Sequence, residues 1–139
     1  QALPMNGTML VRTGATLGEG TLTVRAAPFD DDGFGFVYHY LDAANYHRVS
    51  FHAKRGFVRI VRVRGGVATA LATAKNEQLP RRWWTTYAVR RVGDRHEIYV
   101  SGRLVLEATD RVSGGTTGLY AWAMKDIRFD DFAVLDRAP

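Results

Sequence analysis

The most constraining feature of this chain is an alternation of apolar and polar residues that recurs in short segments bounded by turn residues. In Thr21–Ala27, for example, Leu22, Val24 and Ala26 fall on one side of an extended strand. Successive side chains of a strand point to opposite faces, so this period of two predicts strands with one buried face.

The same signal predicts most of the secondary structure. The other predicted strands are Leu10–Arg12, Phe34–Leu41, Tyr46–Ala53, Phe57–Arg64, Val67–Thr73, Trp83–Val92, His96–Val100, Leu104–Leu106, Gly118–Met124 and Ile127–Leu135. Glycine-containing tight turns such as Gly65-Gly66 and Ser101-Gly102 join several of them. No apolar pattern of period 3.6 lasts three helical turns, so we expect at most one short helix. The sequence therefore predicts an all-β fold, a two-sheet antiparallel jelly-roll sandwich, as a single domain over residues 1–139.

The alternation also assigns a core. We expect burial of Leu22, Val24, Phe36, Val49, Phe51, Ile60, Trp84, Val89, Ile98, Val100, Leu119 and Phe129. Trp83 and Trp84 must face opposite sides of their strand, and Trp84 is the one assigned to the core.

Composition excludes several classes of function. The chain has no cysteine, which rules out disulfides, thiolate metal sites and a cysteine nucleophile. No apolar run approaches the ~18 residues of a membrane-spanning helix, so membrane insertion is not expected.

The net charge of +5 comes mainly from arginines spread one or two to a strand rather than in blocks. This spacing favours exposed strand faces over a nucleic-acid interface. The sequence opens at Gln1 without a signal-peptide pattern. We therefore expect this chain to be one module of a larger protein that has other domains.

The carboxylates do not form a hydrolytic pair. Glycosidases need two carboxylates facing one groove. Glu97 and Glu107 each have an aspartate three residues away, Asp94 and Asp110, but an odd spacing points to opposite faces of a strand. Hydrolysis is therefore disfavoured.

The histidines suggest either structural roles or a base. His47 shares its strand face with Val49 and is expected to pack partly into the core, whereas His39 and His52 are expected on outward faces. Two histidines without a carboxylate are a poor zinc site. A histidine–tyrosine pair for uronic-acid elimination stays open, with the acid drawn from Tyr38, Tyr40 or Tyr46.

Five stretches in sequence order carry a resemblance to a known superfamily. They are Asp31–Phe51, Trp84 with its following strand, Ile98–Val105, Gly118–Trp122 and Phe129–Val134. Together they resemble the concanavalin A-like lectin/glucanase superfamily, and within it the laminin-G-like and thrombospondin C-terminal-like jelly rolls. The resemblance implies a jelly roll whose relatives include carbohydrate-binding modules, adhesion modules, and glycoside hydrolases or lyases.

A structural calcium ion is also implied by this resemblance. Such modules often hold calcium beside the last strand, where Asp130 and Asp131 lie in this sequence. The turn Asp30–Asp32 is a second candidate because calcium prefers several oxygen ligands from one turn.

Aromatic and basic residues on the outward strand faces offer a ligand site. Sugars stack on aromatic faces and hydrogen-bond to planar guanidinium or imidazole groups. If the outward faces form one concave sheet, the ligand-binding residues are Trp122, Tyr120, Arg48, His52, His39 and Arg59. The alternative is that Trp122 and Tyr120 are buried, since both faces of an inner strand can be covered.

We therefore expect a non-catalytic carbohydrate-binding module of a larger extracellular or periplasmic protein. Its ligand would be a polysaccharide or oligosaccharide, and the arginines favour an anionic one. The alternatives are a glycoside hydrolase or polysaccharide lyase domain of the same fold, and a protein-binding adhesion module.

Overall fold

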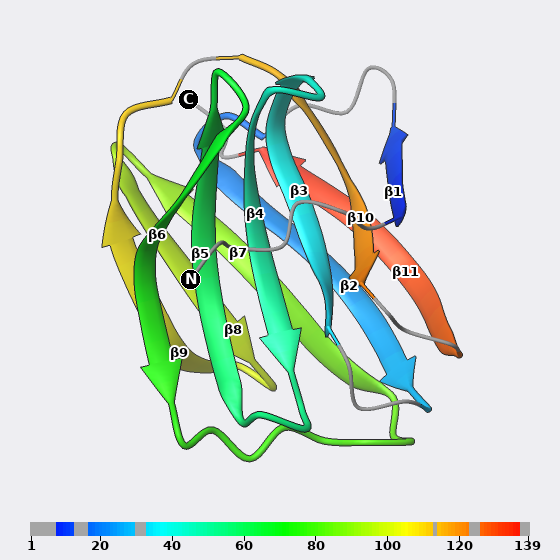
Figure 1. Cartoon of the computed structure of the whole chain (residues 1–139). Helices are drawn as coiled ribbons and strands as arrows, with labels where there is room; N and C mark the ends of the chain where they lie inside the picture. Colours follow the sequence, from blue (N-terminus) through cyan, green and yellow to red (C-terminus); the bar gives the residue numbers. More distant parts are fainter. Residues whose placement is uncertain (1–7, 13–16, 30–32, 113, 123–125, 137–139) are drawn as a thin grey trace.

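A computed structural model of the chain describes residues 8–12, 17–29, 33–112, 114–122 and 126–136 (Figure 1). The strands are β1 (Thr8–Arg12), β2 (Gly20–Pro28), β3 (Gly33–Asp42), β4 (Asn45–His52), β5 (Phe57–Arg64), β6 (Val67–Lys75), β7 (Thr85–Val92), β8 (Arg95–Val100), β9 (Arg103–Thr109), β10 (Thr116–Trp122) and β11 (Ile127–Asp136). Within these ranges every regular element is a strand, as the alternation predicts. The strand predicted over Gly118–Met124 can be followed only as far as Trp122, because residues 123–125 lie outside the described part.

The strands form two antiparallel sheets that pack face to face. The six-stranded sheet has the order β1-β10-β3-β4-β5-β6, and the five-stranded sheet has the order β11-β2-β7-β8-β9 (Figure 1). The predicted two-sheet antiparallel sandwich is thus confirmed. The described residues contain no helix long and apolar enough to cross a membrane.

The core between the sheets consists largely of the residues that the alternation assigned to it. Leu22, Val24, Phe36, Val49, Phe51, Ile60, Val89, Ile98 and Val100 are all buried in one cluster. Leu119 and Phe129 are partly buried and pack against this cluster. Phe34, Tyr38 and Tyr87 complete its aromatic centre, in which the rings of Phe34 and Tyr87 meet edge to face at a centroid distance of 5.0 Å.

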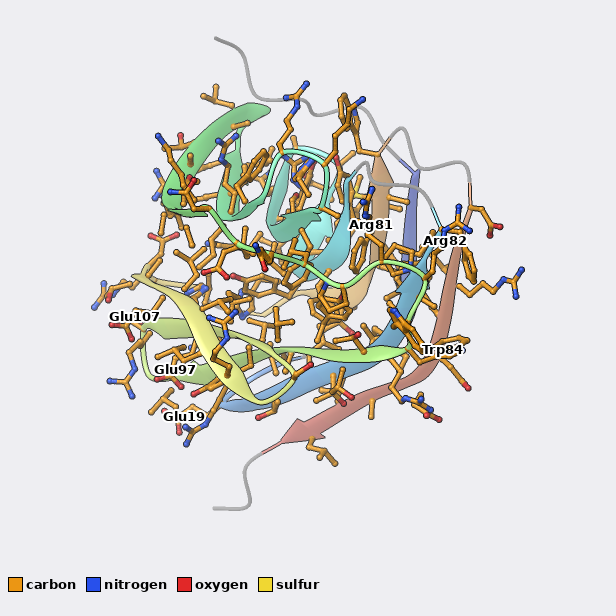
Figure 2. All side chains as sticks on the ribbon, turned by 90° about the horizontal axis from the view of Figure 1, so that it is seen from below. Glu19, Arg81, Arg82, Trp84, Glu97 and Glu107 are labelled. Atoms are coloured by element: carbon orange, nitrogen blue, oxygen red, sulfur yellow. The ribbon has the colours of Figure 1, made fainter. Side chains whose placement is uncertain are left out.

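The assignment of Trp84 to the core is wrong. Its side chain, labelled in Figure 2, is 45% exposed. The guanidinium of Arg25 lies 5.5 Å from the centroid of its ring. Tyr87 and Val89 point into the core from β7, and Trp84 is an odd number of residues from both. Strand parity therefore turns Trp84 outward, just before β7 begins.

A second apolar cluster, which we call the outer cluster, covers the other face of the six-stranded sheet. Its buried members are Val37, Tyr46, Val61, Val63 and Tyr120, with Met9, Tyr40, Ala68 and Trp122 packed against them. Leu119 packs inward while Tyr120 and Trp122 lie on the outer side, so β10 has the face assignment that its alternation predicts. Both sequence interpretations of Tyr120 hold in part, because it faces outward and is nevertheless buried.

Candidate functional site

A narrow groove lies on the outer face of the six-stranded sheet, over β10, β3, β4 and β5, toward the end where β4 runs into β5 (Figure 1). Its cavity volume is about 30 Å³. The lining residues are Arg48, Ser50, His52, Arg55, Phe57, Arg59, Val61, Tyr120 and Trp122. The groove thus sets aromatic rings and cationic groups along a space about as large as one water molecule.

Two glycines of β3, which we call the floor glycines, lie between the strands whose residues line this groove. Gly35 pairs with Tyr120 on one side and Ser50 on the other, and Gly33 lies in the same way between Trp122 and His52. These outward positions carry no side chain, so β10 and β4 can face each other across β3. A Cβ atom on Gly33 would lie 2.5 Å from Cε1 of His52, and one on Gly35 would overlap the carbonyl oxygen of Val49. Glycine is therefore required sterically at position 35, where the neighbour is backbone, whereas at position 33 the neighbour is the side chain of His52.

Arg48 lines the groove as a buried residue, with only 2% of its surface exposed. Its guanidinium is 4.8 Å from the centroid of the Tyr120 ring, and its Nη1 donates a hydrogen bond of 3.3 Å to the Tyr120 hydroxyl. The contact joins a cation to the π face of an aromatic ring, which is stronger when both groups are shielded from water.

His52 and two rings form an aromatic wall. The His52 ring stacks on Phe57 at a centroid distance of 4.3 Å and lies 6.0 Å from the ring of Trp122. Burial, followed by the charges of Arg55, Arg59 and Arg48, lowers the pKa of His52 to about 4. His52 is therefore neutral at pH 7 and offers one donor and one acceptor nitrogen to a ligand.

Arg59 supplies charge at the same wall. Its guanidinium lies 4.5 Å from the Phe57 ring centroid, and its Nε donates a hydrogen bond of 3.1 Å to Oγ1 of Thr73. Burial and the neighbouring Arg48 and Arg55 lower the pKa of Arg59. Like charges so close repel one another, so the groove has a positive potential that favours an anionic group.

The structure brings together five of the six predicted ligand-binding residues: Trp122, Tyr120, Arg48, His52 and Arg59. Sequence reasoning missed Arg55, Phe57 and the floor glycines Gly33 and Gly35. The alternation of glycine with phenylalanine over residues 33–36 was the available signal, because glycines at every second position leave one strand face without side chains.

His39 lies elsewhere, and its expected outward position is wrong. The pairing of β3 with β4 shifts register between Tyr38 and Asp42, and the backbone of His39 has a φ of 49°. This irregularity turns the His39 ring inward, where it lies 5.4 Å from the ring of His47 and 5.8 Å from that of His96. His47 is buried, as its strand face predicts.

These three imidazoles form a buried polar cluster between the sheets. Tyr38 and Nδ1 of His96 are hydrogen-bonded at 2.8 Å, and Arg91 donates from Nη1 to Nε2 of His39 at 3.0 Å. Nε2 of His47 lies 2.8 Å from Oδ2 of Asp110. Burial is the first cause that lowers the pKa of each histidine, to about 2 in His39 and about 4 in His47. Tyr38 is fully buried and hydrogen-bonded, so it is not placed to act as a catalytic acid.

The proposed calcium ligands Asp130 and Asp131 lie on β11, at the register shift between Asp130 and Ala133. Asp131 forms an ion pair of 3.5 Å with Arg25, and Oδ1 of Asp130 accepts a hydrogen bond from the Asp131 backbone. Among the described residues, no three His, Asp or Glu side chains are arranged to hold a metal ion. Asp30–Asp32 lie outside the described residues, and calcium binding stays a prediction.

Solved structures with a similar fold include carbohydrate-binding proteins. The carbohydrate-binding module CBM66 from Bacillus subtilis is 22% identical with a TM-score of 0.76, covering 92% of this chain and 91% of that one. The Caenorhabditis elegans galectin LEC-6 is 14% identical with a TM-score of 0.68, and the match covers 95% of this chain and 92% of LEC-6. Sheep galectin-11 is 9% identical with a TM-score of 0.64, and the match covers 92% of this chain and 99% of the galectin. The chain therefore has the lectin-like jelly-roll sandwich fold. No family model matches the sequence. No curated protein sequence matches it either.

Proposed function

We propose that this chain is a non-catalytic carbohydrate-binding module that recognises a polysaccharide through the groove over Gly33 and Gly35. The observation that carries this proposal is the packing of Arg48 on Tyr120 beside His52 and Trp122. Aromatic faces that accept the apolar side of a sugar ring stand here within reach of nitrogen groups that bind hydroxyls or carboxylates.

The size of the groove determines what can enter it. A cavity of about 30 Å³ admits one hydroxyl or one oxygen of a carboxylate, but not a whole sugar ring. We infer that one substituent reaches toward Arg48 while the ring stacks outside, on Trp122. Trp122 is only partly buried, so part of its indole is accessible for stacking.

The charge of the groove favours an anionic polysaccharide. Arg48, Arg55 and Arg59 all line the groove, and its described lining includes no Asp or Glu. A carboxylate or sulfate would relieve the repulsion among these guanidiniums and form charge-assisted hydrogen bonds with them.

The comparisons support a carbohydrate ligand through the fold alone. CBM66 is a carbohydrate-binding module and LEC-6 is a galectin, but at 22% and 14% identity no residue role is transferred from them. The proposal includes membership of the concanavalin A-like superfamily, which the motifs quoted from the sequence support. It also includes a place in a larger extracellular or periplasmic protein.

The test is affinity electrophoresis of the folded protein in gels that contain neutral or uronate polysaccharides, with and without calcium. We expect retardation by at least one polysaccharide that Trp122→Ala weakens. Trp83→Ala is the matched control, because Trp83 is 73% exposed and does not line the groove. No retardation by any polysaccharide, or equal retardation of the Trp122→Ala protein, would reject the groove as a glycan site. An effect of calcium would be assigned with Asp130→Asn and Asp131→Asn.

One observation favours a second function, β-elimination of a uronate. His52 is neutral at pH 7 and can accept a proton, and Arg48, which lines the same groove, could neutralise a sugar carboxylate. In such a reaction, a base removes the proton beside the carboxylate while an acid protonates the leaving oxygen. Ultraviolet absorbance from unsaturated uronate, lost in the His52→Gln protein, would establish this activity and displace the non-catalytic proposal.

A further inference from the structure

A second and larger cavity opens at the opposite end of the six-stranded sheet, where the β3–β4 and β5–β6 hairpins turn (top of Figure 1). Its volume is about 480 Å³, within the usual range for small-molecule sites. Walls come from the ends of β3, β4 and β5, from the β7–β8 turn at Asp94, and from Arg111 and Val112 after β9. The cavity contains none of the residues that line the groove.

Three arginines line this cavity: Arg62, Arg64 and Arg111. Arg62 forms an ion pair of 3.1 Å with Oδ1 of Asp110, yet its buried Nε has no hydrogen-bond partner. Within the described ranges, Arg64 and Arg111 form no ion pair with any carboxylate. The described lining includes one carboxylate, Asp94, and Asp110 pairs with Arg62, so three guanidinium groups face two carboxylates.

The histidines of the cavity do not add to this charge. His39 and His47 also line it, and burial keeps both of them neutral at pH 7. The positive potential of the cavity therefore comes from guanidinium groups, which stay charged throughout the physiological pH range. An unsatisfied buried N–H beside exposed guanidiniums indicates a place for an acceptor that the protein itself does not supply.

We propose that this cavity is a binding site for an oxyanion, a carboxylate or sulfate carried on a sugar. The planar fork of a guanidinium matches both groups in geometry and can donate two parallel hydrogen bonds to them. Arg64 and Arg111 contact the anion from the rim, and the partly exposed guanidinium of Arg62 adds positive charge from the wall. The volume of about 480 Å³ leaves room for the sugar that carries the charge.

The location of the cavity links it to the groove. Tyr46 and Val63 line the cavity and belong to the outer cluster together with Tyr120, which lines the groove. Along β4, Tyr46 and Arg48 are two residues apart, roughly 7 Å on one strand face. A single anionic glycan could therefore contact both sites. This extension, and the choice of a sugar as the carrier of the anion, rest on the proposed function.

The oxyanion site can be tested without any polysaccharide. Nε–Hε cross-peaks of arginine in ¹H–¹⁵N spectra report directly on Arg62, Arg64 and Arg111. The protein is titrated with glucuronate, with inorganic sulfate and with glucose, at an ionic strength held constant with chloride. We expect saturable shifts of these three signals with glucuronate or sulfate and none with glucose. A tighter response to glucuronate would assign the site to sugar-borne carboxylates, and a tighter response to sulfate would assign it to sulfate groups.

The decisive variant is Arg64→Gln/Arg111→Gln. It should weaken the response about tenfold or more, since each guanidinium supplies charge-assisted hydrogen bonds and tenfold is about 1.4 kcal/mol. Arg90→Gln/Arg128→Gln is the control of equal charge, because both residues lie on the five-stranded sheet and neither lines this cavity. Linear shifts without saturation, or equal weakening in both variants, would overturn the site. The Trp122→Ala protein should respond like wild type, which separates this result from the fate of the groove.

Discussion

His47 and Asp110 connect the two sheets: Nε2 of His47 on β4 lies 2.8 Å from Oδ2 of Asp110, which follows β9. The other oxygen of Asp110 accepts from Nη1 of Arg62 at 3.1 Å. Burial alone would raise the pKa of Asp110, but the hydrogen bond and charge of His47 and the charge of Arg62 outweigh it and lower that pKa. One carboxylate thus satisfies two donors of the six-stranded sheet from outside that sheet.

Asp110→Asn should therefore destabilise the protein. The substitution removes the negative charge of the carboxylate that His47 and Arg62 contact. The free energy of unfolding should fall by roughly 1–3 kcal/mol. Chemical denaturation at pH 7 measures this change. Asp126→Asn is the control, because Asp126 is exposed and its ion pair with Arg128 spans 3.9 Å. Such exposed pairs contribute about 0–1 kcal/mol. Equal losses in the two variants would contradict a special role for Asp110.

Stability should fall in mild acid because of the buried histidines. The folded protein holds His39 with a pKa of about 2 and His47 and His52 with pKa values of about 4, all below the ordinary value of 6.5. Between about pH 6.5 and these values the unfolded chain binds protons that the folded chain does not. The stability that neutral imidazoles contribute is therefore complete above about pH 6.5 and declines below it, by about 1.4 kcal/mol per pH unit for each such histidine.

The source of this decline can be assigned with His39→Gln. The glutamine oxygen can still accept from Arg91 but does not titrate, so the variant should lose stability less steeply between pH 6.5 and about 4.5. Urea denaturation at several pH values gives both slopes. Parallel slopes for the variant and the wild type would show that His39 is not a source.

The two floor glycines should respond differently to an added methyl group. In Gly33→Ala the new Cβ meets the His52 ring, which can rotate away, so the protein should stay folded and lose ligand affinity. In Gly35→Ala the new Cβ meets the β4 backbone at Val49, which cannot move without breaking the pairing. We expect that variant to melt well below Gly33→Ala in thermal denaturation. The reverse order would mean that the floor of the groove is not where we place it.

Trp122→Ala should weaken glycan binding about 2- to 10-fold, which is the loss of a stacking contribution of ~0.5–1.5 kcal/mol. Isothermal titration with the polysaccharide found in the gel screen measures the change, with Trp83→Ala expected to match wild type. If the ligand is anionic, the wild-type affinity should also fall with salt, and Arg59→Gln should reduce that dependence. Unchanged affinity of a folded Trp122→Ala protein would contradict the stacking role.

Phe51→Ala and Trp84→Ala should differ strongly in stability. Phe51 is fully buried and contacts the rings of Phe34, Phe36 and Tyr87, so its truncation should cost about 3–5 kcal/mol. Trp84 contacts Arg25 from an exposed position, and its loss should cost about 1 kcal/mol or less. Denaturant unfolding compares them directly, and similar losses would mean that Trp84 packs more deeply than its exposure indicates.

The sequence predicted features that depend on strand parity. Leu22, Val49 and Phe51 are buried because they share the inward face of regular strands, and Tyr120 and Trp122 face outward for the same reason. Parity fails where a strand is irregular, and His39 turns inward at such a break in register. Trp84 was misassigned although it precedes the core residue Val89 by an odd number of positions, which already indicates the outward side.

Other features were beyond sequence reasoning because they depend on which strands become neighbours. The placement of β10 beside β3 brings Tyr120 opposite Gly35, and no local pattern predicts that pairing. The larger cavity, proposed above as an oxyanion site, likewise combines Arg62 with Arg111, which are far apart in the sequence. Arg62 belongs to β5 of one sheet and Arg111 follows β9 of the other, so only the packing of the two sheets brings them together.

The strand order of the six-stranded sheet also has a kinetic consequence. Strands β3, β4, β5 and β6 are joined by successive hairpins, whereas β10 must return from much later in the chain to pair with β3. Arg48 and Tyr120 are 72 positions apart, so the groove forms through contacts of long sequence range, which are slow to form. Ligand binding should therefore appear late in refolding, after the hairpins have gained their secondary structure. The binding signal would then report that the whole sandwich has closed.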